Sequence, residues 1–330
     1  MTFKFVGVGN AIVDILCNVD DNFIDKNNLN KSHMTLCSKE EQAKLLSQIT
    51  EYWTLPGGSV ANTISTLAKL NNDCGFAGLV SNDLWGDQFK TALEQFGIDL
   101  LAEPSNADLP TGTSVILITP DGERTMNTNL GISEYLNEAK LHTDKVVNSN
   151  WLIIEGYLFD KEKSLDTLLN LVSIAKDKKI NIALSLSDKF CVVRNKDVFN
   201  SLFKDIDLLF SNESEFKEQF DLDIENLEKF EFSKLSNKLP STTVITRSDK
   251  KCIAIHNSST YFVDTKQPTV LADLTGAGDQ FAAGFLYGFD SGWDIVKSLE
   301  FGVDLATKVI SIIGPQLPKE ELISLLKQHI

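Results

Sequence analysis

The chain has 330 residues, of which 42% are hydrophobic, so it can bury a sizeable core as one large α/β domain or two smaller ones. Its formal net charge of −15 would repel a nucleic-acid duplex, so we expect no nucleic-acid partner. The five cysteines are scattered, without the spacing of a zinc site or a disulfide framework, which makes a reducing cytoplasm the expected compartment.

The apolar pattern of the chain changes repeatedly between the strand and helix periods. Residues 3–9 form the first predicted strand, and this segment lacks the charge pattern of an export signal. Ser38 and Glu41 have capping-box spacing at the start of a helix predicted over 38–49. Further strands are predicted at 151–156, 180–187 and 207–211, and further helices at 164–177 and 197–206. This alternation predicts a mostly parallel central sheet covered by helices.

Two segments interrupt the alternation. Residues 11–37 have little helical periodicity, and residues 105–128 contain a strand followed by a Pro-Asp-Gly turn. We expect both segments to form a small β-rich lid inserted in the α/β core. Without a repeat or linker to divide the chain, residues 1–330 are predicted to be a single domain. No segment has the roughly 20 apolar residues needed to cross a bilayer, so no membrane association is expected.

The segment DLTGAGDQFAAGFLYG, residues 273–288, places a glycine-rich turn directly before a predicted helix. Gly276 and Gly278 permit backbone angles that other residues reach only at a cost. The free amides and the dipole at the start of the helix favour a phosphate or a developing negative charge. Asp279 lies beside this anion site and can accept the proton of an alcohol that attacks a phosphoryl group. A glycine turn before a helix with an N-terminal acid is also common without any catalytic role.

Three motifs resemble the PfkB, or ribokinase-like, family of carbohydrate and nucleoside kinases. DLTGAGD is similar to the C-terminal signature of the family, D-T-x-G-A-G-D, with Leu274 in place of the usual threonine. PGGSVANTISTLAKL, residues 56–70, resembles the N-terminal Gly-Gly motif, and GNAIVDI, residues 9–15, resembles the first strand. The resemblance covers nearly the whole chain. It implies a ribokinase-like three-layer α/β/α domain with a mostly parallel central sheet and a small β-rich lid.

The resemblance also implies a set of site residues. Asp279 is the expected general base, and residues 276–279 are the expected anion hole, with Gly276, Ala277 and Gly278 before the base. The expected substrate-binding residues are Asn10, Asp14, Gly57, Gly58, Asn62 and Tyr157. The expected contacts to ATP and its phosphates are Arg124, Asn212, Glu215, Thr246 and Arg247, together with Gly276 and Gly278. Glu215 is the expected Mg²⁺ ligand, through water.

The predicted function is ATP-dependent phosphoryl transfer to the primary hydroxyl of a nucleoside, with ATP and Mg²⁺ as cofactors. The motifs GNAIVDI and GGSVANT resemble the adenosine-kinase branch and bacterial proteins similar to it, which favours conversion of adenosine to AMP in purine salvage. Two alternatives remain at this stage: a kinase of a simple sugar such as ribose or fructose, and a non-catalytic nucleoside-binding protein of the same fold. Both a monomer and a homodimer are compatible with the sequence.

Overall fold

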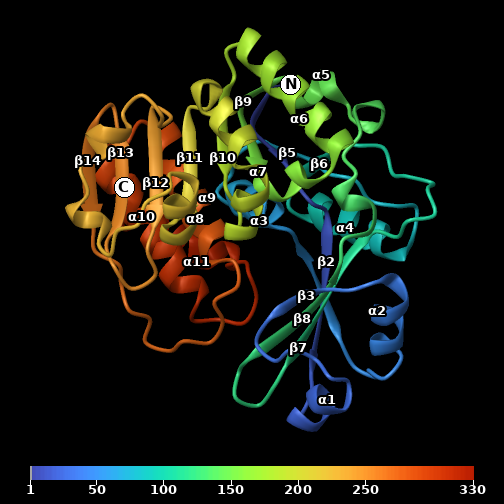
Figure 1. The fold of residues 1–330 in the computed structure, drawn as a ribbon. Helices are drawn as coiled ribbons and strands as arrows, with labels where there is room; N and C mark the ends of the chain where they lie inside the picture. The colour runs from blue at the N-terminus through green and yellow to red at the C-terminus, as the bar shows by residue number, and fades with distance from the viewer. Residues whose placement is uncertain (1) are drawn as a thin grey trace.

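The computed structural model describes residues 2–330 and contains a large and a small β-sheet (Figure 1). The large sheet has nine strands in the order β14-β13-β12-β11-β10-β9-β1-β5-β6. Their bounds are β1 Phe3–Val8, β5 Cys74–Ala77, β6 Ile98–Leu100, β9 Ser149–Glu155, β10 Asn181–Ser185, β11 Leu208–Asn212, β12 Thr242–Thr246, β13 Cys252–His256 and β14 Ser259–Val263. Only β13 and β14 are antiparallel to their neighbours, which confirms the predicted mostly parallel sheet.

Helices cover both faces of this sheet because its strands are apolar on both sides. On β1, Phe5 packs into one buried cluster and Val6 into another, as the strand period of two requires. The first face carries α3 Ser59–Lys69, α4 Leu84–Gln95, α9 Ala277–Asp290 and α10 Ile295–Val309. The second face carries α5 Thr143–Val146, α6 Glu162–Asp177, α7 Lys189–Leu202 and α8 Glu213–Gln219. The result is a three-layer α/β/α arrangement.

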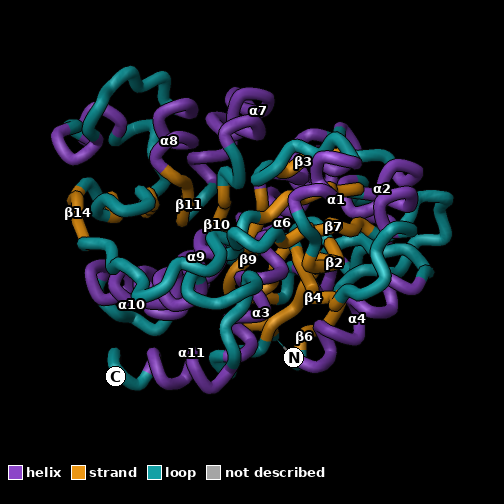
Figure 2. The backbone as a smooth tube through the Cα atoms, turned by 90° about the horizontal axis from the view of Figure 1, so that it is seen from below, coloured by secondary structure: helices purple, strands orange, loops and turns teal. Residues whose placement is uncertain are grey.

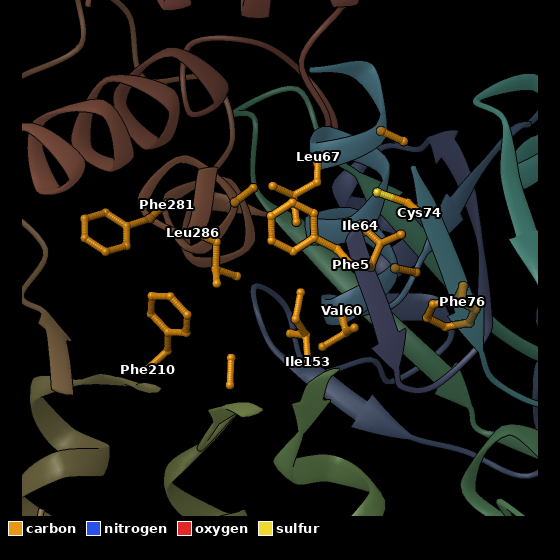
Figure 3. Packing of buried hydrophobic residues seen from close by; sticks show 14 of the residues in the cluster. Phe5, Val60, Ile64, Leu67, Cys74, Phe76, Ile153, Phe210, Phe281 and Leu286 are labelled. Atoms are coloured by element: carbon orange, nitrogen blue, oxygen red, sulfur yellow. The ribbon is translucent and has the colours of Figure 1, made fainter. Parts of the chain in front are cut away.

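The first face brings α3 and α9 together over the middle of the sheet. Figure 3 shows Ile64 and Leu67 of α3 beside Phe5 of β1, with Phe281 and Leu286 of α9 on the other side of the same cluster. Helix α9 also lies beside α10 (Figure 2), and the final helix, α11 Lys319–Leu326, packs against α10. These contacts hold the N-termini of α3 and α9 next to each other.

The small sheet forms a lobe that extends away from the three layers (Figure 1). Its order is β3-β8-β7-β2-β4, with bounds β2 Ile12–Asn18, β3 Met34–Leu36, β4 Trp53–Gly57, β7 Gly112–Ile118 and β8 Arg124–Asn129. Two short helices accompany it, α1 Asp21–Lys26 and α2 Lys39–Leu46. Strands β2, β3 and β7, and all of β8 except its last residue, come from the segments expected to form the lid, whereas β4 lies outside them. Whether this lobe moves as a lid stays a prediction.

Local sequence signals account for some helix boundaries and miss others. The capping box of Ser38 and Glu41 is present at the start of α2, as predicted. The helix predicted over 197–206 instead begins at Lys189, is kinked at Asn195 and ends at Leu202. Its first half was missed because Phe190 and Val193 are exposed, so the apolar residues there do not mark a buried face. Within residues 2–330, none of the helices is long and apolar enough to span a membrane.

Candidate active site

Asp279 lies where the N-termini of α3 and α9 meet. Its carboxylate accepts a hydrogen bond from the Ser59 hydroxyl at 2.6 Å and another from the Asn62 side-chain amide at 2.9 Å. Burial raises the pKa of Asp279 to about 6, while these two hydrogen bonds oppose the rise. The carboxylate is therefore held in one orientation and is largely ionised at neutral pH.

Two adjoining cavities lead to this carboxylate. The smaller, of about 260 Å³, is lined by Asp279, Gly278, Asn212, Glu215 and Thr246 among others. The larger, of about 450 Å³, shares Thr246, Gly278 and Phe281 with it and continues to apolar residues of α10 and its C-cap, namely Val303, Ala306 and Ile310. A continuous groove thus runs from an apolar end, past the glycine loop, to the carboxylate.

The glycine loop presents the start of α9 to this groove. Gly276 is left-handed, with φ of 78°, and a β-carbon there would lie 2.5 Å from the carbonyl oxygen of Pro315. Gly276 also supplies no side-chain cap, so the first-turn amides of α9 receive no acceptor from it. A β-carbon on Gly278 would meet no atom within 4 Å, because this residue faces the open cavity. Backbone N–H groups and the helix dipole therefore offer an anion site beside Asp279.

Asn212 and Glu215 stand on the opposite wall of the smaller cavity. They form a capping box at the start of α8, in which Glu215 accepts from the backbone N–H of Asn212 at 2.9 Å. Burial raises the pKa of Glu215 to about 7, against the lowering effect of the Asn212 hydrogen bonds. The buried Ser211 hydroxyl on this wall has no hydrogen-bond partner within residues 2–330.

These oxygen donors fit a magnesium ion that keeps most of its waters. Mg²⁺ prefers oxygen ligands and often binds through one or two carboxylates and substrate phosphates. Residues 2–330 contain no group of three or more His, Cys, Asp or Glu side chains that could hold a metal. A contact from Glu215 to Mg²⁺ through water, as expected from the sequence, stays a prediction.

The substrate residues expected near the N-terminus gather around Asp14 on β2. A β-carbon on Gly57 would lie 2.5 Å from the Asp14 carboxylate, and one on Gly58 would lie 2.2 Å from the carbonyl oxygen of Asn10. Gly58 also has a φ of 100°, which side-chain-bearing residues rarely adopt. The buried Oδ1 of Asn10 has no partner among the described residues. Close backbone packing therefore requires glycine at 58, whereas Gly57 leaves room for the Asp14 carboxylate.

Arg124 joins the small sheet to the loop before α9. Its Nη2 lies 2.8 Å from Oδ2 of Asp273, and both side chains are almost fully buried. The approach is not aligned for a hydrogen bond, so both Nη groups keep unused donors. Burial raises the pKa of Asp14 to about 7, which Arg124 opposes and Asp279 and Asp273 reinforce. Arg124 is therefore the cation that acts on the carboxylates of both Asp273 and Asp14.

Two of the expected contacts have other partners in the structure. The Arg247 guanidinium is paired with Glu213 at 3.1 Å and Glu228 at 2.8 Å, and Arg247 also lines the larger cavity. A contact of Arg247 with phosphate stays a prediction. Tyr157 is half-buried, and its hydroxyl donates to the backbone carbonyl of Ser187 at 3.3 Å. Tyr157 is not among the residues that line the smaller cavity, although Ser187 is.

Glu155, at the end of β9, belongs to the site although no sequence motif indicated it. This residue is fully buried and accepts from the backbone N–H groups of Asn10 at 2.8 Å and Val60 at 3.1 Å. Burial raises its pKa to about 7, which these two hydrogen bonds oppose. Glu155 thereby ties the loop after β1 to the start of α3. The only sequence signal was a lone acid at the end of the apolar strand WLIIEG.

Ser59 and Asp273 were also missed as site residues. Ser59 follows directly after the Gly-Gly motif and donates to Asp279, and Asp273 opens the DLTGAGD motif and pairs with Arg124. Both contacts join segments far apart in the sequence, so neither follows from a local pattern.

The α/β/α fold carries a positioned carboxylate, a helix N-terminus and a groove with one apolar end. Together these features define the class of protein as a small-molecule kinase. Residues 30–322 match the family described as "pfkB family carbohydrate kinase", and the chain belongs to this family. It is therefore a PfkB kinase, and kinases of this family use ATP.

Individual relatives agree with this assignment. The chain is 27% identical to a Saccharomyces cerevisiae protein named "Adenosine kinase", over 98% of this chain and 99% of that protein. Among solved structures, a Sinorhizobium meliloti adenosine kinase and a probable sugar kinase from Rhizobium etli each have a TM-score of 0.88 and 30% identity, with both chains fully covered. These similarities confirm the ribokinase-like fold and a kinase of nucleosides or sugars.

Proposed function

We propose that this kinase transfers the γ-phosphoryl group of ATP to the primary hydroxyl of adenosine, giving AMP and ADP. The observation that carries the proposal is the Asp279 carboxylate, held by Ser59 and Asn62 beside the N-terminus of α9. The likeness to the yeast and Sinorhizobium meliloti adenosine kinases supports the choice of acceptor.

The face of the small sheet that carries Asp14 suits the hydroxyls of a ribose. Asp14, Ser114 and Thr128 are neighbours across β2, β7 and β8, so they form a polar row on one face. The carboxylate and hydroxyls of this row can pair with ribose hydroxyls. The next row on the same face is apolar, but its Leu16 and Ile116 are already buried against their own neighbours in the protein. The choice of a nucleoside over a simple sugar therefore rests on the likeness to the adenosine kinases.

The reaction follows from the placement of the charged groups. The acceptor oxygen forms a bond to the γ-phosphorus as the bond to the β,γ-bridging oxygen breaks, and ADP leaves. Asp279 takes the proton of the acceptor hydroxyl, which it can do because its carboxylate is ionised above about pH 6. The first-turn amides of α9 and the unused donors of Arg124 stabilise negative charge on the transferring group. Mg²⁺, held through water by Glu215, would neutralise charge on the ATP phosphates.

A simple sugar kinase is the second candidate, because the Rhizobium etli neighbour is described as a probable sugar kinase. ADP release from ATP, measured with adenosine, inosine, guanosine, cytidine, ribose and fructose separately, distinguishes the two. Selective turnover of adenosine is the expected result. Turnover of ribose or fructose alone would replace the nucleoside assignment with the sugar assignment and leave the role of Asp279 intact.

A further inference from the structure

Lys69, the last residue of α3, is a buried cation whose hydrogen-bond partners are uncharged. Only 9% of the residue is exposed, and its ammonium donates to the side-chain oxygen of Gln316 at 2.9 Å and to the carbonyl oxygen of Leu317 at 3.1 Å. The ammonium also lies over the ring of Phe96, 4.4 Å from its centroid. Burial lowers the pKa of Lys69 to about 8, and no carboxylate opposes this effect. Burying a charge without a counter-ion is costly, so the local packing alone does not explain this lysine.

The contacts of Lys69 continue to the proposed base. The side-chain NH₂ of Gln316 donates to Oδ1 of Asn62 at 3.0 Å. The NH₂ of Asn62 then donates to Oδ2 of Asp279 at 2.9 Å. Two amides therefore connect the ammonium to the carboxylate in a single line of hydrogen bonds.

The charges at the two ends fix the direction of this line. An ammonium can only donate, so it holds the oxygen of Gln316 towards itself and the NH₂ towards Asn62. An ionised carboxylate can only accept, so it requires the NH₂ of Asn62. With either amide turned over, two donors or two acceptors would face each other at a buried contact. Lys69 and Asp279 thus impose the same orientation on Gln316 and Asn62.

A neighbouring contact on the same face of α3 has no fixed hydrogen-bond direction. Thr66, one turn before Lys69, exchanges hydrogen bonds with Gln280 at 2.7 and 3.0 Å. A hydroxyl can donate or accept by rotating, so Thr66 imposes no direction on its partner. Neither Thr66 nor Gln280 donates to the Asp279 carboxylate. Thr66 therefore provides a matched control for the loss of a buried hydrogen bond on α3.

We propose that Lys69 is a positioning residue for phosphoryl transfer: through Gln316 it fixes the amide of Asn62 that holds the Asp279 carboxylate. This inference rests on the proposed function of Asp279 as the base. Lys69 lines neither cavity and does not contact the carboxylate itself, so its effect reaches the base through the side chains of Gln316 and Asn62.

The test compares three variants in steady-state ADP release. Gln316→Glu gives Lys69 a carboxylate partner but removes the NH₂ that holds Asn62, so it separates stability from positioning. Lys69→Met keeps the apolar stem and removes the donor. Thr66→Val is the control. We expect kcat to fall at least tenfold in Gln316→Glu and Lys69→Met, with KM for ATP changed less than twofold. Thermal unfolding should show a smaller loss of stability in Gln316→Glu than in Lys69→Met, because the new carboxylate pairs with the buried ammonium.

The pH profile of kcat gives a readout that a purely structural role would not change. The Asn62 hydrogen bond lowers the pKa of Asp279, so its weakening should move the acidic limb to higher pH. Asp14 and Glu155 also face Asp279 and titrate alongside it, but neither contacts Gln316. The limb should therefore shift in Gln316→Glu and stay in place in Thr66→Val.

The possible outcomes separate this inference from the proposed function. A Gln316→Glu variant with the kcat and acidic limb of the wild type would refute the inference alone, as would a Thr66→Val variant impaired as strongly as Lys69→Met. A wild type that releases ADP with none of the acceptors would refute the proposed function and the inference together.

Discussion

Replacing Gly58 with alanine tests whether close backbone packing builds the substrate end of the site. The residue has a φ of 100°, a strained conformation that costs an alanine about 1–3 kcal/mol. The new β-carbon would also lie 2.2 Å from the carbonyl oxygen of Asn10, and relieving this overlap by a backbone shift costs about 1–3 kcal/mol more. Alanine restores less than about 1 kcal/mol by restricting the unfolded chain. The net loss of stability is about 3 kcal/mol.

Thermal unfolding measures this loss. For a chain of 330 residues, 1 kcal/mol corresponds to about 1.5 °C in Tm, so Gly58→Ala should lower Tm by about 4–5 °C. Gly122→Ala is the matched control, because Gly122 has a φ of 83° but an added β-carbon there meets nothing within 4 Å. It should cost about 1 kcal/mol, or 1–2 °C. Equal shifts in the two variants would show that the contact with Asn10 does not constrain Gly58.

Three further predictions concern the base, the anion site and the buried ion pair. Gly278→Ala should fold normally, because its β-carbon enters open space. It should raise KM for ATP at least tenfold, because the new methyl group fills part of the cavity proposed for the phosphates. Unchanged ATP kinetics would show that Gly278 is not part of the site. The pKa of Asp279 in the folded protein, about 6, exceeds its ordinary value of 3.8, so ionisation of this residue progressively destabilises the folded state as pH rises towards and through 6. Relative to the wild type, the free energy of unfolding of Asp279→Asn should therefore be higher at pH 8 than at pH 5 by about 1 kcal/mol in denaturant titrations. A difference that does not change with pH would contradict the raised pKa. Arg124→Met should lower the free energy of unfolding by about 3 kcal/mol, because it leaves Asp273 buried without its cation. The double variant with Asp273→Asn should lose less stability than the sum of the two single variants. Simple additivity of the two losses would count against an interaction between Arg124 and Asp273.

The layers of the fold follow from local patterns in the sequence. Apolar runs such as those of β1 and β9 predict strands buried on both faces, and the alternation with amphipathic helices predicts a parallel sheet. The start of α2 follows from Ser38 and Glu41 alone. These features depend on residues within one or two turns of each other, which is the range over which periodicity and capping act.

Contacts between distant segments could not be predicted from such local patterns. Arg247 has the residue type of a phosphate ligand, but its pairing with Glu228 depends on how the segment after α8 returns to β12. Glu155 holds two backbone amides that only the folded sheet brings together. The motifs placed Asp279 and Asn62 as candidates, but the line from Asn62 through Gln316 to Lys69 spans the first and last thirds of the chain.

The most direct test of the central claim is magnesium-dependent ADP release by the wild type and by Asp279→Asn, with adenosine as acceptor and ribose as the control. The account predicts turnover of adenosine by the wild type and a loss of several orders of magnitude in kcat in Asp279→Asn, with ATP binding largely retained. Near-normal turnover by Asp279→Asn would contradict the assignment of Asp279 as the base.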